Sequence, residues 1–147
     1  MGKIIKVNPR LILPTQPKLE RERFERALRE FKESGIIGFS PFPCREYSNN
    51  YAAIDGHSRT TIATLVNEEI KIYVPENRED VMHYSDFPNT QCKAIDEMNY
   101  HIRERYHSLS CGLFITIRDY KIRTFNDLIK RNRGIVDSVW NSVFSTN

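Results

Sequence analysis

The stretch Tyr51–Val74, YAAIDGHSRTTIATLVNEEIKIYV, sets the order of elements that we expect at the centre of the chain. Its first four residues are apolar and predict a short buried strand. Residues 61–66 carry apolar side chains at the spacing of a helix with one packed face. Ile70–Val74 alternates and predicts a second strand. The stretch should therefore form a strand, a turn, a helix and a returning strand.

The turn between that strand and that helix, Asp55–Thr60, has the composition of an anion-binding site. A helix N-terminus leaves N–H groups unpaired and carries a partial positive charge. Gly56 permits close backbone approach, two hydroxyl side chains offer donors, and Arg59 presents a planar fork suited to phosphate. A plain helix cap is the alternative, in which Asp55 or Ser58 caps the helix and the arginine is solvated.

The composition predicts one small globular domain. The chain has 147 residues, of which 39% are hydrophobic and 28% charged, enough apolar material for a core. No run approaches the roughly 18 apolar residues of a membrane span, and Met1–Arg10 does not have the pattern of a signal peptide. The three cysteines form no CxxC pair. We therefore expect a cytoplasmic protein with reduced thiols and no membrane partner.

The flanking segments predict the fold class. Lys3–Val7 alternates like a strand, and residues 20–34 form an amphipathic helix whose charges are expected to be solvated. Further elements are expected at 36–47 (an edge or bulged strand), 90–108 (helix), 113–117 (strand or buried segment), 124–130 and 136–144 (helices). The order predicts an α+β fold with a small mixed sheet and packed helices. Residues 1–84 would form a core that contains the anion-binding turn, which becomes a nucleotide-binding core under the resemblance described below, and 85–147 would form a helical extension packed on it.

Basic side chains gather towards the carboxyl end, although the net charge is only +3. They are Arg118, Lys121, Arg123, Lys130, Arg131 and Arg133. With aromatic residues between them, these side chains could contact a nucleic-acid backbone. A solvated helical surface is the commoner role of such a run, so DNA stays an alternative partner.

The combined pattern resembles the ParB amino-terminal/sulfiredoxin superfamily over roughly residues 3–75. The resemblance rests on an extended segment with Gln16-Pro17, a helix closing near Ser34-Gly35, the Asp-Gly-His-x-Arg sequence at 55–59, and the strand Ile70–Val74. It is strongest to small archaeal and bacterial members, some of which are free serine kinases.

The resemblance implies a nucleotide site. Members hold nucleotide phosphates at this strand, turn and helix: CTP in partition proteins, and ADP or ATP in the kinases and sulfiredoxins. Here that implies phosphate contacts from Gly56, His57, Ser58, Arg59 and Thr60. Asp55 would bind Mg²⁺ or accept a proton, and Asp55 and His57 would be the catalytic pair.

The sequence departs from each relative at a chemically important position. His57 stands where sulfiredoxin has its reactive cysteine, and only Arg59 remains of the two arginines of partition proteins. Ser58 replaces the second histidine of the serine kinases, and Gln16 stands near the place of their catalytic glutamate. Sulfiredoxin chemistry is therefore not expected.

Two functions follow from these patterns. The first is binding of a nucleoside di- or triphosphate, with phosphotransfer or hydrolysis as the chemistry it would support; a small-molecule acceptor and an oligomeric state stay open. The alternative is a DNA-associated ParB-like module, for partition, regulation or nuclease action. For a nuclease, Asp55 with Glu69 and Lys71 has a suitable spacing, although a helix separates the two parts.

Overall fold

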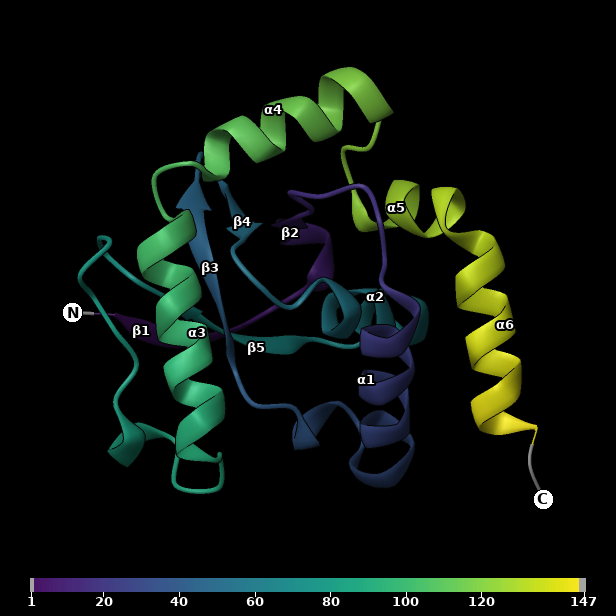
Figure 1. The fold of residues 1–147 in the computed structure, drawn as a ribbon, viewed down its shortest axis with the longest axis horizontal. Helices are drawn as coiled ribbons and strands as arrows, with labels where there is room; N and C mark the ends of the chain where they lie inside the picture. Colours follow the sequence, from purple (N-terminus) through teal and green to yellow (C-terminus); the bar gives the residue numbers. More distant parts are fainter. Residues whose placement is uncertain (1, 146–147) are drawn as a thin grey trace.

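A computed structural model describes residues 2–145, and its centre is a mixed five-stranded sheet (Figure 1). The strands are β1 (Lys3–Val7), β2 (Ile12–Leu13), β3 (Phe42–Tyr47), β4 (Asn50–Ala53) and β5 (Ile70–Val74), in the spatial order β1-β5-β3-β4-β2. The pairs β1–β5 and β3–β4 are antiparallel, whereas β3–β5 and β2–β4 are parallel. The expected α+β class with a small mixed sheet is confirmed.

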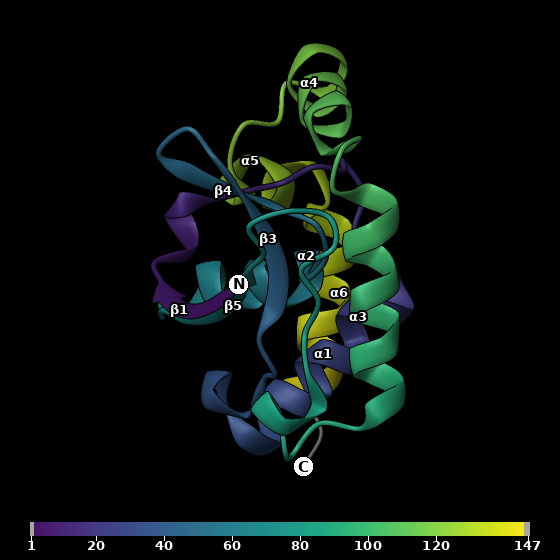
Figure 2. The same cartoon turned by 90° about the vertical axis from the view of Figure 1, so that its left-hand side faces the viewer.

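The described part of the chain also has six α-helices. They are α1 (Arg21–Ser34), α2 (His57–Val66), α3 (Cys92–Arg105), α4 (Leu109–Tyr120), α5 (Phe125–Arg131) and α6 (Arg133–Phe144). Three short 3-10 turns lie at η1 (Pro9–Leu11), η2 (Ile36–Gly38) and η3 (Tyr84–Asp86). In Figure 1, α3 and α6 flank the molecule on opposite sides, with α1 and α2 between them and α4 across the top. Figure 2 shows the same arrangement from the side, where α4 lies above α3.

Of the edge or bulged strand expected at 36–47, residues 42–47 form β3 and residues 36–38 form a 3-10 turn. The expected edge position is wrong, because β3 lies inside the sheet between β5 and β4. Its two prolines suggested an edge, since proline cannot donate a ladder hydrogen bond. Pro43 lies where pairing passes from β5 to β4: Phe42 and Pro43 face β5, and Cys44 begins the β4 pairing. The Pro43 carbonyl accepts from the N–H groups of Ile54 and Asp55 at 3.1 and 3.2 Å. The interior position thus tolerates proline because the ladder changes partner there.

The expected strand or buried segment at 113–117 is also wrong, since these residues belong to α4. The buried residues of α4 are Leu109, Leu113 and Thr116, at helical spacing. Phe114 and Ile115 point outward and are 58% and 42% exposed. A short apolar run does not by itself separate a strand from a helix, and here only one side of it is packed.

The hydrophobic core continues across residue 84. Its buried members run from Val7 to Val143 and include side chains from α3, α5 and α6. Asn132, between α5 and α6, accepts a hydrogen bond from the Leu19 N–H (3.1 Å) and donates to the Pro17 carbonyl (2.9 Å). The carboxyl-terminal helices therefore hold the segment that leads into α1. Among the described helices, none has both the length and the apolar character needed to cross a bilayer.

Candidate functional site

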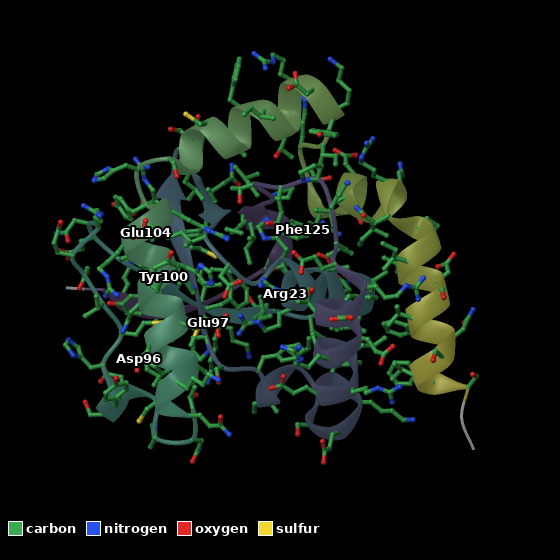
Figure 3. All side chains as sticks on the ribbon, viewed as in Figure 1. Arg23, Asp96, Glu97, Tyr100, Glu104 and Phe125 are labelled. Atoms are coloured by element: carbon green, nitrogen blue, oxygen red, sulfur yellow. The ribbon has the colours of Figure 1, made fainter. Side chains whose placement is uncertain are left out.

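A cavity of about 350 Å³ opens where the N-terminus of α2 meets α1 and α3. Four arginines line it, Arg23, Arg26, Arg59 and Arg105, together with four carboxylates, Glu20, Glu30, Asp55 and Glu97. Figure 3 shows Arg23 of α1 and Glu97 of α3 in the space between the two helices. Its volume is that of a small-molecule site, and its wall is strongly charged.

The N-terminus of α2 is uncapped. The helix begins at His57, four residues before the predicted 61, so residues 57–60 form its first turn. Its N-cap is Gly56, in the left-handed region at φ 87° and ψ 24°, and no side chain bonds to the first-turn N–H groups. The first internal bond runs from the Thr60 N–H to the Gly56 carbonyl at 2.9 Å. The structure thus excludes capping by Asp55 or Ser58, and within residues 2–145 no group accepts from the N–H groups of residues 57–59.

His57 lies under the cavity as a neutral imidazole. Its Nε2 accepts the Thr15 N–H at 3.0 Å, and its ring packs against Phe125 with 5.7 Å between centroids. Burial lowers the pKa of His57 to about 4, against the opposing effect of Asp55. With Nε2 engaged, the ring joins the segment before α1 to the start of α2, and proton transfer would have to use Nδ1.

Arg59 is held on three sides. Its Nη1 donates to the Ser40 carbonyl at 3.2 Å, its Nη2 lies 3.5 Å from Asp55 Oδ2, and its guanidinium stacks over the Phe42 ring at 4.8 Å. The side chain is only 20% exposed, so it is not the solvated arginine of the capping alternative. Stacking and hydrogen bonding fix the plane of the guanidinium at the cavity wall.

Asp55 is ionised beside that arginine. Burial alone would raise the pKa of Asp55, but Arg59 and the Gly56 N–H hold it below its usual range. Within residues 2–145 no cluster of three or more His, Cys, Asp or Glu side chains could hold a metal ion. Asp55 still fits Mg²⁺, which usually binds one or two carboxylates and completes its shell with substrate phosphates and water.

Of the predicted site residues, Thr60 lies away from the cavity. It is fully buried, and its hydroxyl donates to the Gly56 carbonyl at 2.8 Å. Asp55, Gly56, Ser58 and Arg59 line the cavity with His57. The strand end and the first turn of α2 therefore meet at one cavity, and Thr60 serves the helix instead. The phosphate contacts expected of these residues stay a prediction.

The sequence pattern does not indicate the walls contributed by α1 and α3. The charged side chains Arg23 and Arg26 are exposed, as expected for residues 20–34, and they also line the open cavity. Arg23 pairs there with Glu20 at 3.2 Å. The signal that could have found them is their position on α1 next to the buried residues Phe24 and Ala27, which places them at the edge of the packed face. Arg105 of α3 donates to the Ile54 carbonyl at 3.4 Å and reaches the cavity from the other side.

His101 is a second unpredicted polar group near the site. It lies one helical turn from both Glu97 and Arg105 on α3, and its Nε2 is 4.0 Å from a Glu97 carboxylate oxygen. Its Nδ1 is buried with no hydrogen-bond partner among the described residues. Burial lowers the pKa of His101, so this imidazole is also predominantly neutral at pH 7.

The three residues of the possible nuclease site, Asp55, Glu69 and Lys71, do not lie together in the structure. Asp55 lines the cavity at the start of α2, whereas Glu69 and Lys71 line a different hollow beyond its other end, with Lys6 and Ile37. A ten-residue helix is about 15 Å long, so no single metal ion could contact both groups.

The basic carboxyl-terminal residues lie on α4, α5, α6 and the connections between them. Arg118 pairs with Asp119 at 2.7 Å, Arg133 lies 3.6 Å from Asp137, and Arg131 stacks on Tyr120 at 4.8 Å. Lys121 is the C-cap of α4 and has a left-handed backbone conformation. Arg123 precedes the N-cap of α5, and Lys130 lies in the last turn of α5. Arg118, Arg131 and Arg133 are thus engaged by side chains of the chain itself.

No protein-family model matches the chain, and no curated protein matches it either. Its function is therefore inferred from the geometry of the cavity.

Proposed function

We propose that the cavity at the start of α2 binds a nucleoside di- or triphosphate through its phosphate groups. One observation carries the proposal: the uncapped first turn of α2 opens on the same cavity as Arg59 and three further arginines. Unpaired N–H groups at a helix N-terminus and arginine forks are two common phosphate-binding groups of proteins. The resemblance of residues 55–59 to the ParB/sulfiredoxin pattern supports a nucleotide in particular.

Each group has a physical role in this proposal. The N–H groups of residues 57–59 donate to one phosphate, and Gly56 supplies the left-handed N-cap from which they start. Arg59 needs no large rearrangement to add a second contact, because Phe42 and the Ser40 carbonyl already orient it. Arg23, Arg26 and Arg105 would neutralise the remaining phosphate charge from α1 and α3.

Asp55 has two chemical roles in this proposal, as a ligand of Mg²⁺ and as the acceptor of a proton. Mg²⁺, when bound with the nucleotide, would supply the positive charge that lets this carboxylate stay close to phosphate. In a phosphotransfer reaction the terminal phosphoanhydride bond breaks, a new P–O bond forms to a hydroxyl acceptor, and Asp55 takes the proton of that hydroxyl. In hydrolysis water is the acceptor. The ionised state of Asp55 suits both roles.

Arg59→Lys tests the proposed phosphate contact. The variant should bind ATP with Mg²⁺ more weakly by about 1–3 kcal/mol, because a single ammonium cannot replace a stacked guanidinium fork. Isothermal titration calorimetry measures the change. Arg29→Lys is the matched control, since Arg29 lies on α1, pairs with Glu25 at 3.4 Å and does not line the cavity. Equal affinity for all three proteins would remove Arg59 from the binding site.

Asp55→Asn tests the metal role. Without Mg²⁺ the variant should bind ATP about tenfold more tightly than the wild type, since a carboxylate that repels phosphate is gone and Arg59 is released. With Mg²⁺ the order should reverse, because the amide is a weaker ligand for the cation. Titrations with and without the metal measure both values. The same affinity ratio in the two conditions would contradict a metal contact from Asp55.

A further inference from the structure

The uncharged polar side chains around the cavity are largely engaged with one another or with the backbone. Gln16 Nε2 donates to the Lys18 carbonyl at 3.2 Å. The hydroxyls of Ser40 and Thr90 share a hydrogen bond of 2.7 Å. Ser58 is the other uncharged hydroxyl on the wall, and it lies in the first turn of α2, where phosphate is expected. Few neutral groups are thus left to recognise the edge of a nucleobase.

The wall also offers no aromatic platform for a base. Its apolar members are Leu19, Ala27, Ala94 and Met98, and among the described residues no Phe, Tyr or Trp lines it. The ring of Phe42 is covered by Arg59. Base recognition by proteins usually combines stacking on such a ring with hydrogen bonds to the base edge. The imidazole of His57 is on the wall, but it is buried against Phe125, so the described wall presents no free ring on which a base could stack.

The arginines of the wall remain, and a guanidinium attracts phosphate, although Arg23 also pairs with Glu20 at 3.2 Å. Arg23, Arg26 and Arg105 line the cavity with the α2 N-terminus and come from two different helices. A guanidinium distinguishes ligands by the number and position of their anionic oxygens. The length of the phosphate chain should therefore set the affinity.

Resting on the proposed function, we infer that this cavity selects the oligophosphate chain and discriminates little among bases. Its ligand class is then an oligophosphate or a simple oligophosphate ester, of which the nucleoside triphosphates are members. The base of a bound nucleotide would lie towards the open side of the cavity, outside the arginine-lined part.

The test is a calorimetric series at fixed Mg²⁺ with ATP, GTP, CTP, UTP, AMP and inorganic tripolyphosphate. The four triphosphates should agree within about threefold, tripolyphosphate should bind within about tenfold of ATP, and AMP should bind more than about tenfold more weakly. One triphosphate bound over about tenfold more tightly than the other three would overturn the inference but leave the proposed function intact. If tripolyphosphate alone did not bind, the inference would also be overturned and the proposed function would again stay intact. If none of these ligands bound, both the inference and the proposed function would be overturned.

Arg26→Gln supplies an independent arm, with Arg29→Gln as the control on the same helix. If Arg26 contacts the phosphate chain, its loss should weaken all four triphosphates and tripolyphosphate by a common factor of about three to ten. The Arg29 variant should match the wild type, since Arg29 does not line the cavity. A loss confined to one nucleotide would mean that the wall reads the base, and would overturn the inference.

Discussion

Gly56→Ala should lower the free energy of unfolding by about 2–5 kcal/mol, the sum of two separate costs. Gly56 is in the left-handed region at φ 87°, where an L-residue costs about 1–2 kcal/mol. A Cβ there would also lie 2.2 Å from Cδ2 of Phe42, and overpacking of a core costs about 1–3 kcal/mol more. Because Arg59 stacks on that ring, the variant should also lose phosphate affinity. Urea unfolding at neutral pH measures the stability.

Two other glycines serve as comparisons. Gly35 has φ 72° and ψ −177°, a conformation different from that of Gly56, and no atom lies within 4 Å of the position that a Cβ would take, so Gly35→Ala should show only the backbone cost of that conformation. Gly134 lies in α6 with open space around it, and Gly134→Ala should be neutral or stabilising by up to about 1 kcal/mol. If Gly56→Ala costs no more than the backbone cost of about 1–2 kcal/mol, the contact with Phe42 is not as close as described.

Acid should destabilise the protein through His57, well before most carboxylates titrate. Burial lowers the pKa of this imidazole from 6.5 to about 4, so below pH 6.5 the unfolded chain binds a proton that the folded protein excludes. The stability is fully present above pH 6.5 and is lost as the pH falls to 4, by about 3 kcal/mol. Unfolding by urea at a series of pH values measures the slope.

His57→Gln provides the control for this effect. Its amide oxygen can still accept the Thr15 N–H, and it does not titrate. His101 has a pKa lowered in the same direction and should leave a smaller slope in the variant, while the low pKa of Asp55 acts at more acidic pH. An NMR titration of the His57 ring in the wild type should show a neutral imidazole down to about pH 4. Protonation near pH 6.5, or identical slopes in the two proteins, would contradict the buried neutral state.

Local sequence patterns predicted those strands and helices that can be recognised without knowing which other element they pair with. Lys3–Val7 and Ile70–Val74 have the predicted bounds because strict or near-strict alternation marks a strand wherever it pairs. The α1 helix was also predicted, from its apolar stripe. In contrast, the interior position of β3 depends on the change of ladder partner at Pro43, which only the assembled sheet reveals.

The site divides in the same way. A strand end followed by a glycine and an arginine predicted the Asp55–Arg59 wall from local sequence. The arginines of α1 and α3 are brought there by tertiary packing between segments far apart in the chain, and local patterns cannot report such pairings. The engagement of His57 by Thr15 is likewise a long-range contact.

The central claim is that phosphate binds at the start of α2, and the most direct measurement is an amide NMR titration with ATP and Mg²⁺. The largest saturable shifts are expected at residues 56–59, whose first-turn N–H groups are uncapped, with smaller ones near Arg23, Arg26 and Arg105. Arg59→Lys should weaken these shifts together. Absence of saturable shifts, or shifts centred on the basic residues between 118 and 133, would contradict the claim.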